Sequence, residues 1–282
     1  MTTASSAGWH RSRRALPGLP LTLGITLTYL SLLVLIPLAG LFFRASGLGL
    51  SGLWATLTSQ RVLHALQLSF GGALVAAALD AVFGAIVAWT LVRYEFPGRR
   101  ILHSMIDLPF ALPTAVAGIA LTALYAPNGW LGAPLAKLGI NVAYTPIGVI
   151  LAMTFISLPF AVRTLEPVLA DLSKQYEEAA ATLGASRLQT VARVVFPAVL
   201  PALLTGTALA FARAVGEYGS IIFIAGNLPN VSEIAPLLIM IRLEEFDYAG
   251  ATAIACAMLV LSFFILLAIN ALQAWNRRMA SA

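Results

Sequence analysis

Charged residues are scarce in this sequence: they make up 10% of its 282 positions, against roughly 25% in an average soluble domain. Hydrophobic residues make up 60%. A chain with so few charges cannot cover a soluble core with a solvated surface, and its 22 Gly and 15 Pro are spread through apolar sequence. The composition therefore excludes a soluble enzyme and a disordered chain, and it indicates a multi-spanning membrane protein.

Cysteine and histidine are also scarce. The single cysteine, Cys256, lies inside an apolar run, so an internal disulfide or a redox pair is impossible. The three histidines, His10, His64 and His103, are far apart in the sequence, and none belongs to a motif with metal-ligand spacing. We therefore expect no metal site and no catalytic residues in this chain.

A nucleotide-binding loop is missing. The motif G-x-x-x-x-G-K-[ST] places a lysine after a glycine, whereas the only lysines, Lys137 and Lys174, follow Ala136 and Ser173. The chain alone should hydrolyse no ATP and hold no cofactor. A self-contained primary pump is therefore excluded, and energy from ATP would have to come from another chain.

Six apolar stretches are long enough to cross a bilayer, which takes about 20 helical residues at a rise of 1.5 Å each. The first is too long for the core of a signal peptide, so we expect a retained helix. The stretches are residues 21–43, 65–92, 101–125, 143–162, 198–224 and 248–272. The sequence thus predicts an all-α polytopic membrane protein with about six transmembrane helices.

Lysine and arginine are divided unevenly between the two sets of connections. Segment 1–20, loop 93–100, segment 163–197 and tail 276–282 carry 12 of the 17, and the opposite loops carry four. Positively charged connections are retained in the cytoplasm, so we expect both termini to be cytoplasmic, flanking a membrane domain of residues 21–275. The basic residues form no stripe, so we expect no nucleic-acid partner.

Polar residues and prolines interrupt two of the predicted spans. The start of the third span should be irregular, because it contains Asp107, Pro109, Pro113 and Gly118. Such a segment could form the wall of a water-filled path, or it could be a kinked helix packed on its neighbours. Asp80, midway along the second span, is costly there unless a partner or water compensates its charge.

The fifth predicted span carries a charged pair. Arg213 and Glu217 are four residues apart and share one helical face, so they can pair. Either the pair is structural and neutralises two costly charges, or Arg213 supplies positive potential to an anion path while Glu217 positions it or forms part of a gate.

The connection 163–197 differs from the short loops elsewhere, because it is long and helical by pattern. Gly184 stands where a helix C-cap takes a left-handed conformation, and Ser186 with Gln189 forms a capping box for a second helix that should end or kink near Pro197. Apolar residues recur before Gly184 at the spacing of an amphipathic surface helix, in the order Leu172, Tyr176, Ala179, Ala180 and Leu183.

Three interpretations of this helical hairpin are open from its pattern. It could lie on the membrane surface without a specific partner. A DNA-binding helix-turn-helix is disfavoured, because the hairpin is tethered between two spans and has no basic recognition face. It could instead dock on a partner, since Ala179 and Ala180 admit close approach, Glu177 and Glu178 offer charge, and Gly184 fixes the bend.

The hairpin and other parts of the chain resemble a known family. EAAATLG at 178–184 followed by VVFP at 194–197 resembles the EAA loop of ABC importer permeases, E-A-A-x3-G-x9-I-x-L-P, with Val194 and Phe196 in place of Ile and Leu. Further strings resemble the T-type permease subunits of sulfate/thiosulfate importers, over nearly the whole chain after residue 20. They are RYEFPGRR at 93–100, DLPFALPTAVAG at 107–118, RAVGEYGSIIFIAGN at 213–227 and RLEEFDYAGATAIA at 242–255.

The resemblance implies a type I ABC importer permease fold and a pore subunit that carries sulfate or thiosulfate across the bacterial inner membrane. Residues 171–197 would then form the coupling loop, which contacts a separate ATPase. Its contact residues would be Tyr176, Glu177, Glu178, Ala179, Ala180 and Gly184.

The resemblance also implies partners. They are a homologous second permease subunit in a heterodimer, a dimer of ATPase subunits that holds ATP and magnesium, and a periplasmic sulfate-binding protein. Molybdate or tungstate permeases share the GE(Y/F)G and LPxxLP patterns, so such a permease is an alternative. A secondary anion transporter and a passive membrane scaffold are less favoured.

Overall fold

The computed structural model describes the backbone of residues 18–280. Side chains are described for residues 18–271 and for Gln273. The expectations for most of segment 1–20 and for the side chains of tail 276–282 therefore lie outside the described residues. Residues 18–280 contain helices and no strand, which confirms the predicted all-α class.

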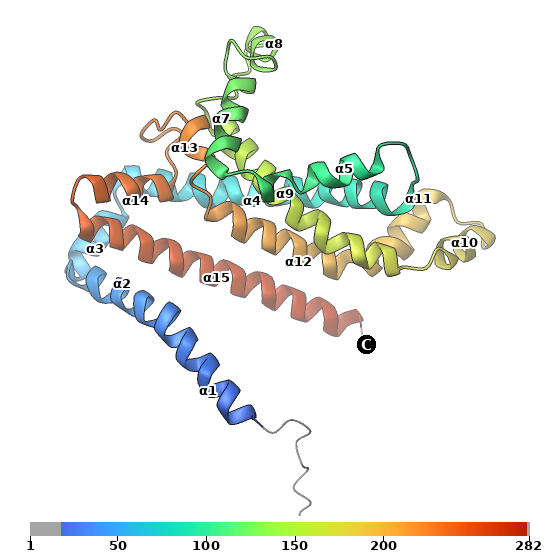
Figure 1. Cartoon of the computed structure of the whole chain (residues 1–282), viewed down its shortest axis with the longest axis horizontal. Coiled ribbons are helices and arrows are strands. Elements are labelled where there is room, and N and C mark those ends of the chain that lie inside the picture. Colours follow the sequence, from blue (N-terminus) through green and yellow to red (C-terminus); the bar gives the residue numbers. More distant parts are fainter. Residues whose placement is uncertain (1–17, 281–282) are drawn as a thin grey trace, which may run out of the picture.

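Four long helices make up the body of the molecule (Figure 1). Helix α9 packs on both α4 and α12, and α15 packs on α12. Small residues allow this close approach, since a Cβ on Gly84 of α4 would lie 2.8 Å from the Cβ of Ala161 in α9. Their bounds are α4 Gln60–Arg93, α9 Pro146–Asp171, α12 Phe196–Val215 and α15 Tyr248–Ala280.

Shorter helices lie at the two ends and on one side of this body (Figure 1). Helices α3 and α14 lie at one end and α10 and α11 at the other, while α7 and α8 project sideways. Their bounds are α1 Leu19–Leu30, α2 Ile36–Ser46, α3 Gly49–Leu57, α5 Arg99–Ile106, α6 Leu108–Ala111, α7 Thr114–Tyr125, α8 Gly132–Lys137, α10 Gln175–Thr182, α11 Arg187–Thr190, α13 Ile221–Ile224 and α14 Ala235–Glu244.

Five helical segments within the described residues are long and apolar enough to cross a membrane. They correspond to the first, second, fourth, fifth and sixth predicted stretches, and they are Leu19–Ser46, Gln60–Arg93, Pro146–Asp171, Arg187–Val215 and Tyr248–Ala271. The chain is therefore a multi-pass membrane protein.

The third predicted stretch, 101–125, is not one continuous helix. It is divided into α5, which ends before Asp107, and α6 and α7, which are separated because Leu112 takes an extended backbone (φ −82°, ψ 135°) before Pro113. The irregularity expected from Asp107, Pro109 and Pro113 is thus confirmed. Gly118, predicted to contribute to it, lies instead within the regular helix α7, and the single span is wrong.

The fifth predicted stretch, 198–224, also differs from the structure. Its helix starts earlier, at Arg187, and ends at Val215, after which a short connection leads to α13. Of the two expectations for Pro197, an end or a kink, the end is wrong, because the helix runs through this residue.

Two π-helical turns explain how helices continue past proline. The turns Ser31–Leu35 and Val191–Val195 each come directly before a helix whose second residue is proline, Pro37 or Pro197. Proline lacks an N–H and crowds the carbonyl four residues earlier, and a wider turn accommodates both effects. The π turn at 191–195 thus joins α11 to α12 without a break.

The four positively charged connections were expected on one side of the membrane. Figure 1 shows the connection from α4 to α5, the pair α10–α11 and the end of α15 toward the same end of the long helices, whereas α1 diverges from the body and its start lies nearer the middle. Which side of the membrane this end faces stays a prediction.

Candidate functional site

The hairpin of α10 and α11 has the turn that the sequence predicts. Gly184 has a φ of +83°, in the left-handed region that glycine adopts at little cost. In the capping box, the backbone N–H of Gln189 donates to Ser186 Oγ at 3.4 Å, and the Ser186 N–H donates to Gln189 Oε1 at 2.8 Å. Local sequence alone therefore determines the bend between the two helices.

Apolar side chains on the outside of this hairpin are left uncovered by the described chain. Tyr176 is 59% exposed and Leu183 is 88% exposed, Glu178 and Ala179 are exposed, and Ala180 is half-buried. Leu172, which was expected to extend the same stripe, instead follows the end of α9 and packs against the core. The exposed face is suited to contact another molecule.

The inner side of the hairpin is tied to the long helices by one arginine. Arg93 Nη2 lies 2.8 Å from Glu177 Oε1 and donates to the carbonyl of Leu172 at 3.0 Å. The Arg93 guanidinium also lies 5.5 Å from the ring centre of Trp89. Glu177 therefore faces the body of the protein and anchors α10, whereas Tyr176 and Glu178 face outward. The sequence indicated Arg93 only as a charge that sets orientation.

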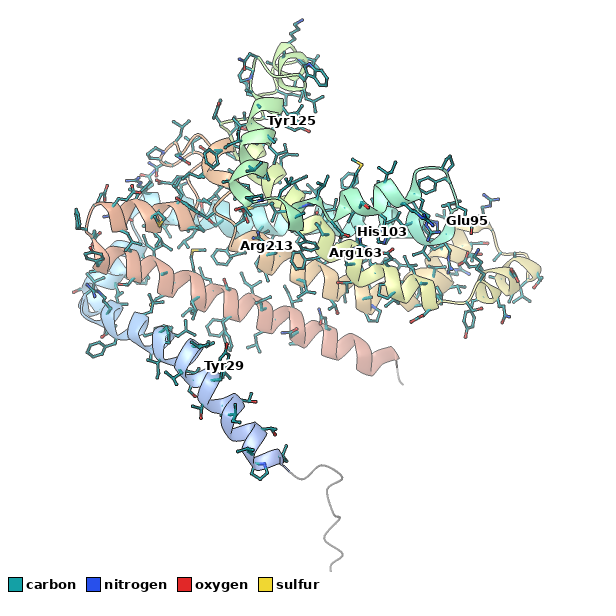
Figure 2. The ribbon with its side chains drawn as sticks, viewed as in Figure 1. Tyr29, Glu95, His103, Tyr125, Arg163 and Arg213 are labelled. Carbon is teal, nitrogen blue, oxygen red and sulfur yellow. The ribbon has the colours of Figure 1, made fainter. Side chains whose placement is uncertain are left out.

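A second cluster of charges surrounds the break between α5 and α6. Arg163 of α9 donates to both carboxylate oxygens of Asp107, at 2.9 and 2.5 Å, and to Glu166 Oε2 at 2.6 Å. The His103 ring lies 2.7 Å from Arg163 Nη1 and 3.1 Å from Glu166 Oε1. Figure 2 shows His103 and Arg163 close together on the same part of the bundle. The sequence indicated Asp107 but missed these three partners.

Two distant segments, each next to predicted path residues, pack closely on one another through glycines. Pro109 is buried and Pro113 caps α7. A Cβ on Gly118 of α7 would lie 2.7 Å from the Cα of Ser220, and one on Gly219 would lie 3.0 Å from the Cβ of Thr114. The connection after α12 therefore packs directly on α7, and only glycine leaves room for this contact.

Arg213 and Glu217 form the predicted ion pair, with Arg213 Nη1 2.6 Å from Glu217 Oε2. Glu217 Oε1 accepts from the N–H and the hydroxyl of Ser220, both at 2.9 Å, so the carboxylate also fixes the turn before α13. The Glu217 side chain is 2% exposed and that of Arg213 is 30% exposed. The guanidinium thus remains accessible while its partner is fixed.

The two charged clusters are separate. Among the described residues no hydrogen bond or ion pair joins the group around Asp107 to Arg213 or Glu217, and Figure 2 shows Arg213 farther along the bundle than Arg163. Asp80 belongs to neither cluster: it is buried between α4 and α9, where the Ser157 hydroxyl contacts its carboxyl group. The partner that sequence reasoning could not name for Asp80 is thus Ser157.

No metal centre is present in the part of the chain that the structure describes, since no group of three or more His, Cys, Asp or Glu side chains is placed to hold an ion.

The ion pair Arg61–Glu233, at 2.7 Å, links the start of α4 to the connection before α14 and was not predicted from sequence. These residues are structural ties between helices.

Comparison with known proteins shows that this multi-pass helical fold is that of a membrane permease of the ABC importer type. Residues 80–278 match the family described as "Binding-protein-dependent transport system inner membrane component". The chain belongs to this family, and the family resemblance of the sequence is confirmed.

Individual relatives cover nearly the whole chain. It is 48% identical to the sulfate transport system permease protein CysT of Salmonella typhimurium over 93% of this chain and 95% of that one. It is 51% identical to CysT of Synechococcus elongatus, over 90% and 91% of the two chains. It is 49% identical to the probable sulfate transport system permease protein cysT of Nephroselmis olivacea, over 90% and 89% of the two chains.

Solved structures share the fold at low sequence identity. One is a bacterial ABC transporter that imports the acidic polysaccharide alginate, with a TM-score of 0.69 and 17% identity over 90% of this chain and 93% of that chain. Another is an alginate ABC transporter in complex with a pentasaccharide-bound periplasmic protein, with a TM-score of 0.74 and 16% identity over 92% and 93%. These similarities establish the permease fold.

Proposed function

We propose that this chain is a pore-forming membrane subunit of an ATP-driven importer for sulfate or thiosulfate. The observation that carries the proposal is the near-half identity, across about nine-tenths of the chain, to proteins described as sulfate transport permeases. Two chains this similar over nine-tenths of their length share a fold, which supports a shared function. The chain itself is a pore subunit and not an enzyme.

Coupling to a separate ATPase is assigned to the outer face of the α10–α11 hairpin. This face is apolar and acidic, and it is formed by the exposed residues Tyr176, Glu178 and Ala179. Gly184 fixes its bend, and the small, half-buried side chain of Ala180 lies beneath it. This surface lies at the end of the molecule where the positively charged connections gather, which is the cytoplasmic end by the positive-inside rule. The ATPase would hold ATP and magnesium, and both termini of this chain would be cytoplasmic.

A homologous second permease subunit is the proposed partner within the membrane. Helix α1 has no buried residue, and Figure 1 shows it diverging from the bundle. The projecting segment α7–α8 exposes 90% of Trp130 and 75% of Leu138. Such apolar surfaces on opposite parts of one chain are suited to pack against a second subunit.

A periplasmic sulfate-binding protein is the proposed source of substrate. One solved relative in fold carries a periplasmic protein, which supports this type of delivery. On the path itself, Arg213 is the candidate for contact with the dianion, because its guanidinium is partly exposed and its orientation is fixed through Glu217. The broken segment around Asp107, Pro109 and Pro113 is the candidate wall or gate beside it.

Uptake of radiolabelled sulfate tests this function. Cells that express the complete transporter should accumulate sulfate in an ATP-dependent manner, with thiosulfate as a competitor and molybdate as a weak one. The purified chain alone should show no ATP hydrolysis, and sulfate-stimulated hydrolysis should arise only when ATPase and binding protein are added. Uptake blocked by molybdate but not by thiosulfate would overturn the substrate assignment, and hydrolysis by the isolated chain would overturn the role as a permease.

A further inference from the structure

A cavity of about 870 Å³ lies between the ends of α4 and α9 and the hairpin that follows them. It is lined by residues of α4, α9 and α10 and of the continuous helix made by α11, the π turn and α12. The cavity therefore begins where the long apolar helices meet the polar hairpin, at the level where a membrane would give way to water.

The two ends of this cavity differ in chemistry. Its polar end is lined by Arg93, Lys174, Glu177 and Arg187, so three basic groups face one acid. Its other end, deeper along the long helices, is apolar and is lined by residues such as Ile86, Trp89, Leu165, Phe196 and Val199. A ligand that fills the whole cavity needs an anionic part and an apolar part.

Only one of the three basic groups is supplied with acceptors. Arg93 pairs with Glu177 and donates to the Leu172 carbonyl, although its buried Nε has no acceptor within the described chain. Lys174 and Arg187 make no ion pair with any residue in the described range. The polar end thus carries two cations without a counter-charge from the chain.

We propose that this cavity binds one anionic phospholipid molecule. Lys174 and Arg187 contact its phosphate, and an acyl chain follows the groove between Trp89 and Phe196 into the membrane. A free inorganic anion would fill only the polar end, and a zwitterionic lipid would bring a second cation to an end that is already positive. The lipid satisfies both the unpaired cations and the apolar wall.

The lipid site and the proposed ATPase contact use different faces of α10. Lys174, Glu177 and Ala181 line the cavity at spacings of three and four residues, whereas Tyr176 and Leu183 point outward. The bound lipid would therefore hold the hairpin from behind without occupying its contact surface. Membranes rich in anionic lipid would stabilise the orientation in which the hairpin meets its partner.

The test measures lipid binding to the full chain, purified with the proteins that assemble with it and depleted of lipid. Native mass spectrometry with dioleoylphosphatidylglycerol should show one retained molecule per chain, and phosphatidylcholine should not compete. Lys174→Gln and Arg187→Gln should each weaken binding about five-fold, and the pair of changes about 20-fold, as expected for loss of surface cations near an anionic headgroup. Brominated phosphatidylglycerol should quench tryptophan emission, and Trp89→Phe should remove part of that quenching.

Arg193→Gln is the matched control. Arg193 is exposed on the same continuous helix and is absent from the cavity wall, so the change removes an equal charge outside the cavity. Its affinity for phosphatidylglycerol should stay within two-fold of that of the unmodified protein. Equal weakening by Arg193→Gln would show general surface attraction and overturn the site. Displacement of the lipid by 10 mM inorganic sulfate would assign the cavity to a soluble anion, which also overturns the proposal.

Discussion

The hairpin turn and the broken-helix region both depend on glycine, but for opposite reasons. Gly184 has a positive φ and nothing within 4 Å of the position where a Cβ would stand. Gly118 has no unusual φ, yet a Cβ there would collide with the backbone of Ser220. The first glycine serves backbone conformation and the second serves packing. Substitution should therefore strain the chain locally at the hairpin and separate two segments at the broken helix.

The largest effect is expected from Gly118→Ala. The new methyl group would meet backbone atoms, which cannot rotate away, so we expect a cost of about 3 kcal/mol, at the upper end of the range for overpacking. The measurement is the thermal midpoint of the extracted transporter, together with its yield. Gly71→Ala in α4 is the control, because that position is open and helical. Similar losses in both variants would mean that the contact with Ser220 is unimportant.

Arg213→Met tests whether the ion pair beside this contact is structural or serves transport. A lone charge inside a membrane costs about 2.5 to 3.5 kcal/mol on insertion scales, and we expect about 2 kcal/mol here because Ser220 still donates to Glu217. The measurement is the amount of assembled transporter. Yield near that of the unmodified protein would show that the pair adds little to stability.

Adding Glu217→Gln to Arg213→Met separates the two roles. The amide oxygen of glutamine can still accept from Ser220, so assembly should recover while both charges are gone. Sulfate uptake per assembled complex should then stay low if Arg213 contacts the anion. Recovery of uptake would remove Arg213 and Glu217 from the path.

Gly184→Val tests whether the glycine of the hairpin turn is needed for ATPase binding. A β-branched residue resists a φ of +83°, and we expect a cost of about 1 to 2 kcal/mol with intact membrane insertion and impaired ATPase binding. Gly139→Val is the matched control, since Gly139 has a φ of +78° and open surroundings but lies before α9, outside the hairpin. Pull-down of the ATPase should fail only for the first variant. Failure of both would assign the defect to general backbone strain.

The smallest effect is expected from Glu178→Lys, which reverses one exposed charge on the outer face of α10. Exposed ion pairs are weak, so ATPase affinity should fall about five-fold with no change in stability. Glu95→Lys, at an exposed position between α4 and α5, makes the same change outside the hairpin and should leave affinity unchanged. Unchanged affinity in both variants would exclude Glu178 from the contact.

The two regions also differ in how far sequence could predict them. The bend at Gly184 and the cap at Ser186 depend on neighbours within a few residues, and both are confirmed. The partner of Asp107 is Arg163, which is 56 positions away, and no local pattern specifies that pairing. The extended backbone before Pro113 likewise ends a helix that counting apolar residues predicted to be continuous.

Some charged residues have no partner nearby in the sequence and gain one only when the helices pack together. Asp80 and Ser157 come together because α4 and α9 pack closely along small residues. Arg93 and Glu177 come together because the hairpin folds back on the end of α4. Sequence identified the costly charges, and three-dimensional packing was needed to assign what compensates them.

The unbroken helix from Arg187 to Val215 has a consequence for timing. It is 29 residues long, about 43 Å at 1.5 Å per residue, and it connects the hairpin to the ion pair of Arg213. A loop of this length would absorb small displacements, whereas a hydrogen-bonded rod carries them along its axis. Apart from what the π turn Val191–Val195 takes up, movement at one end accompanies movement at the other. If the hairpin docks on an ATPase as proposed, a displacement there would reach Arg213 as one collective helix motion, and shifts of this kind take microseconds to milliseconds.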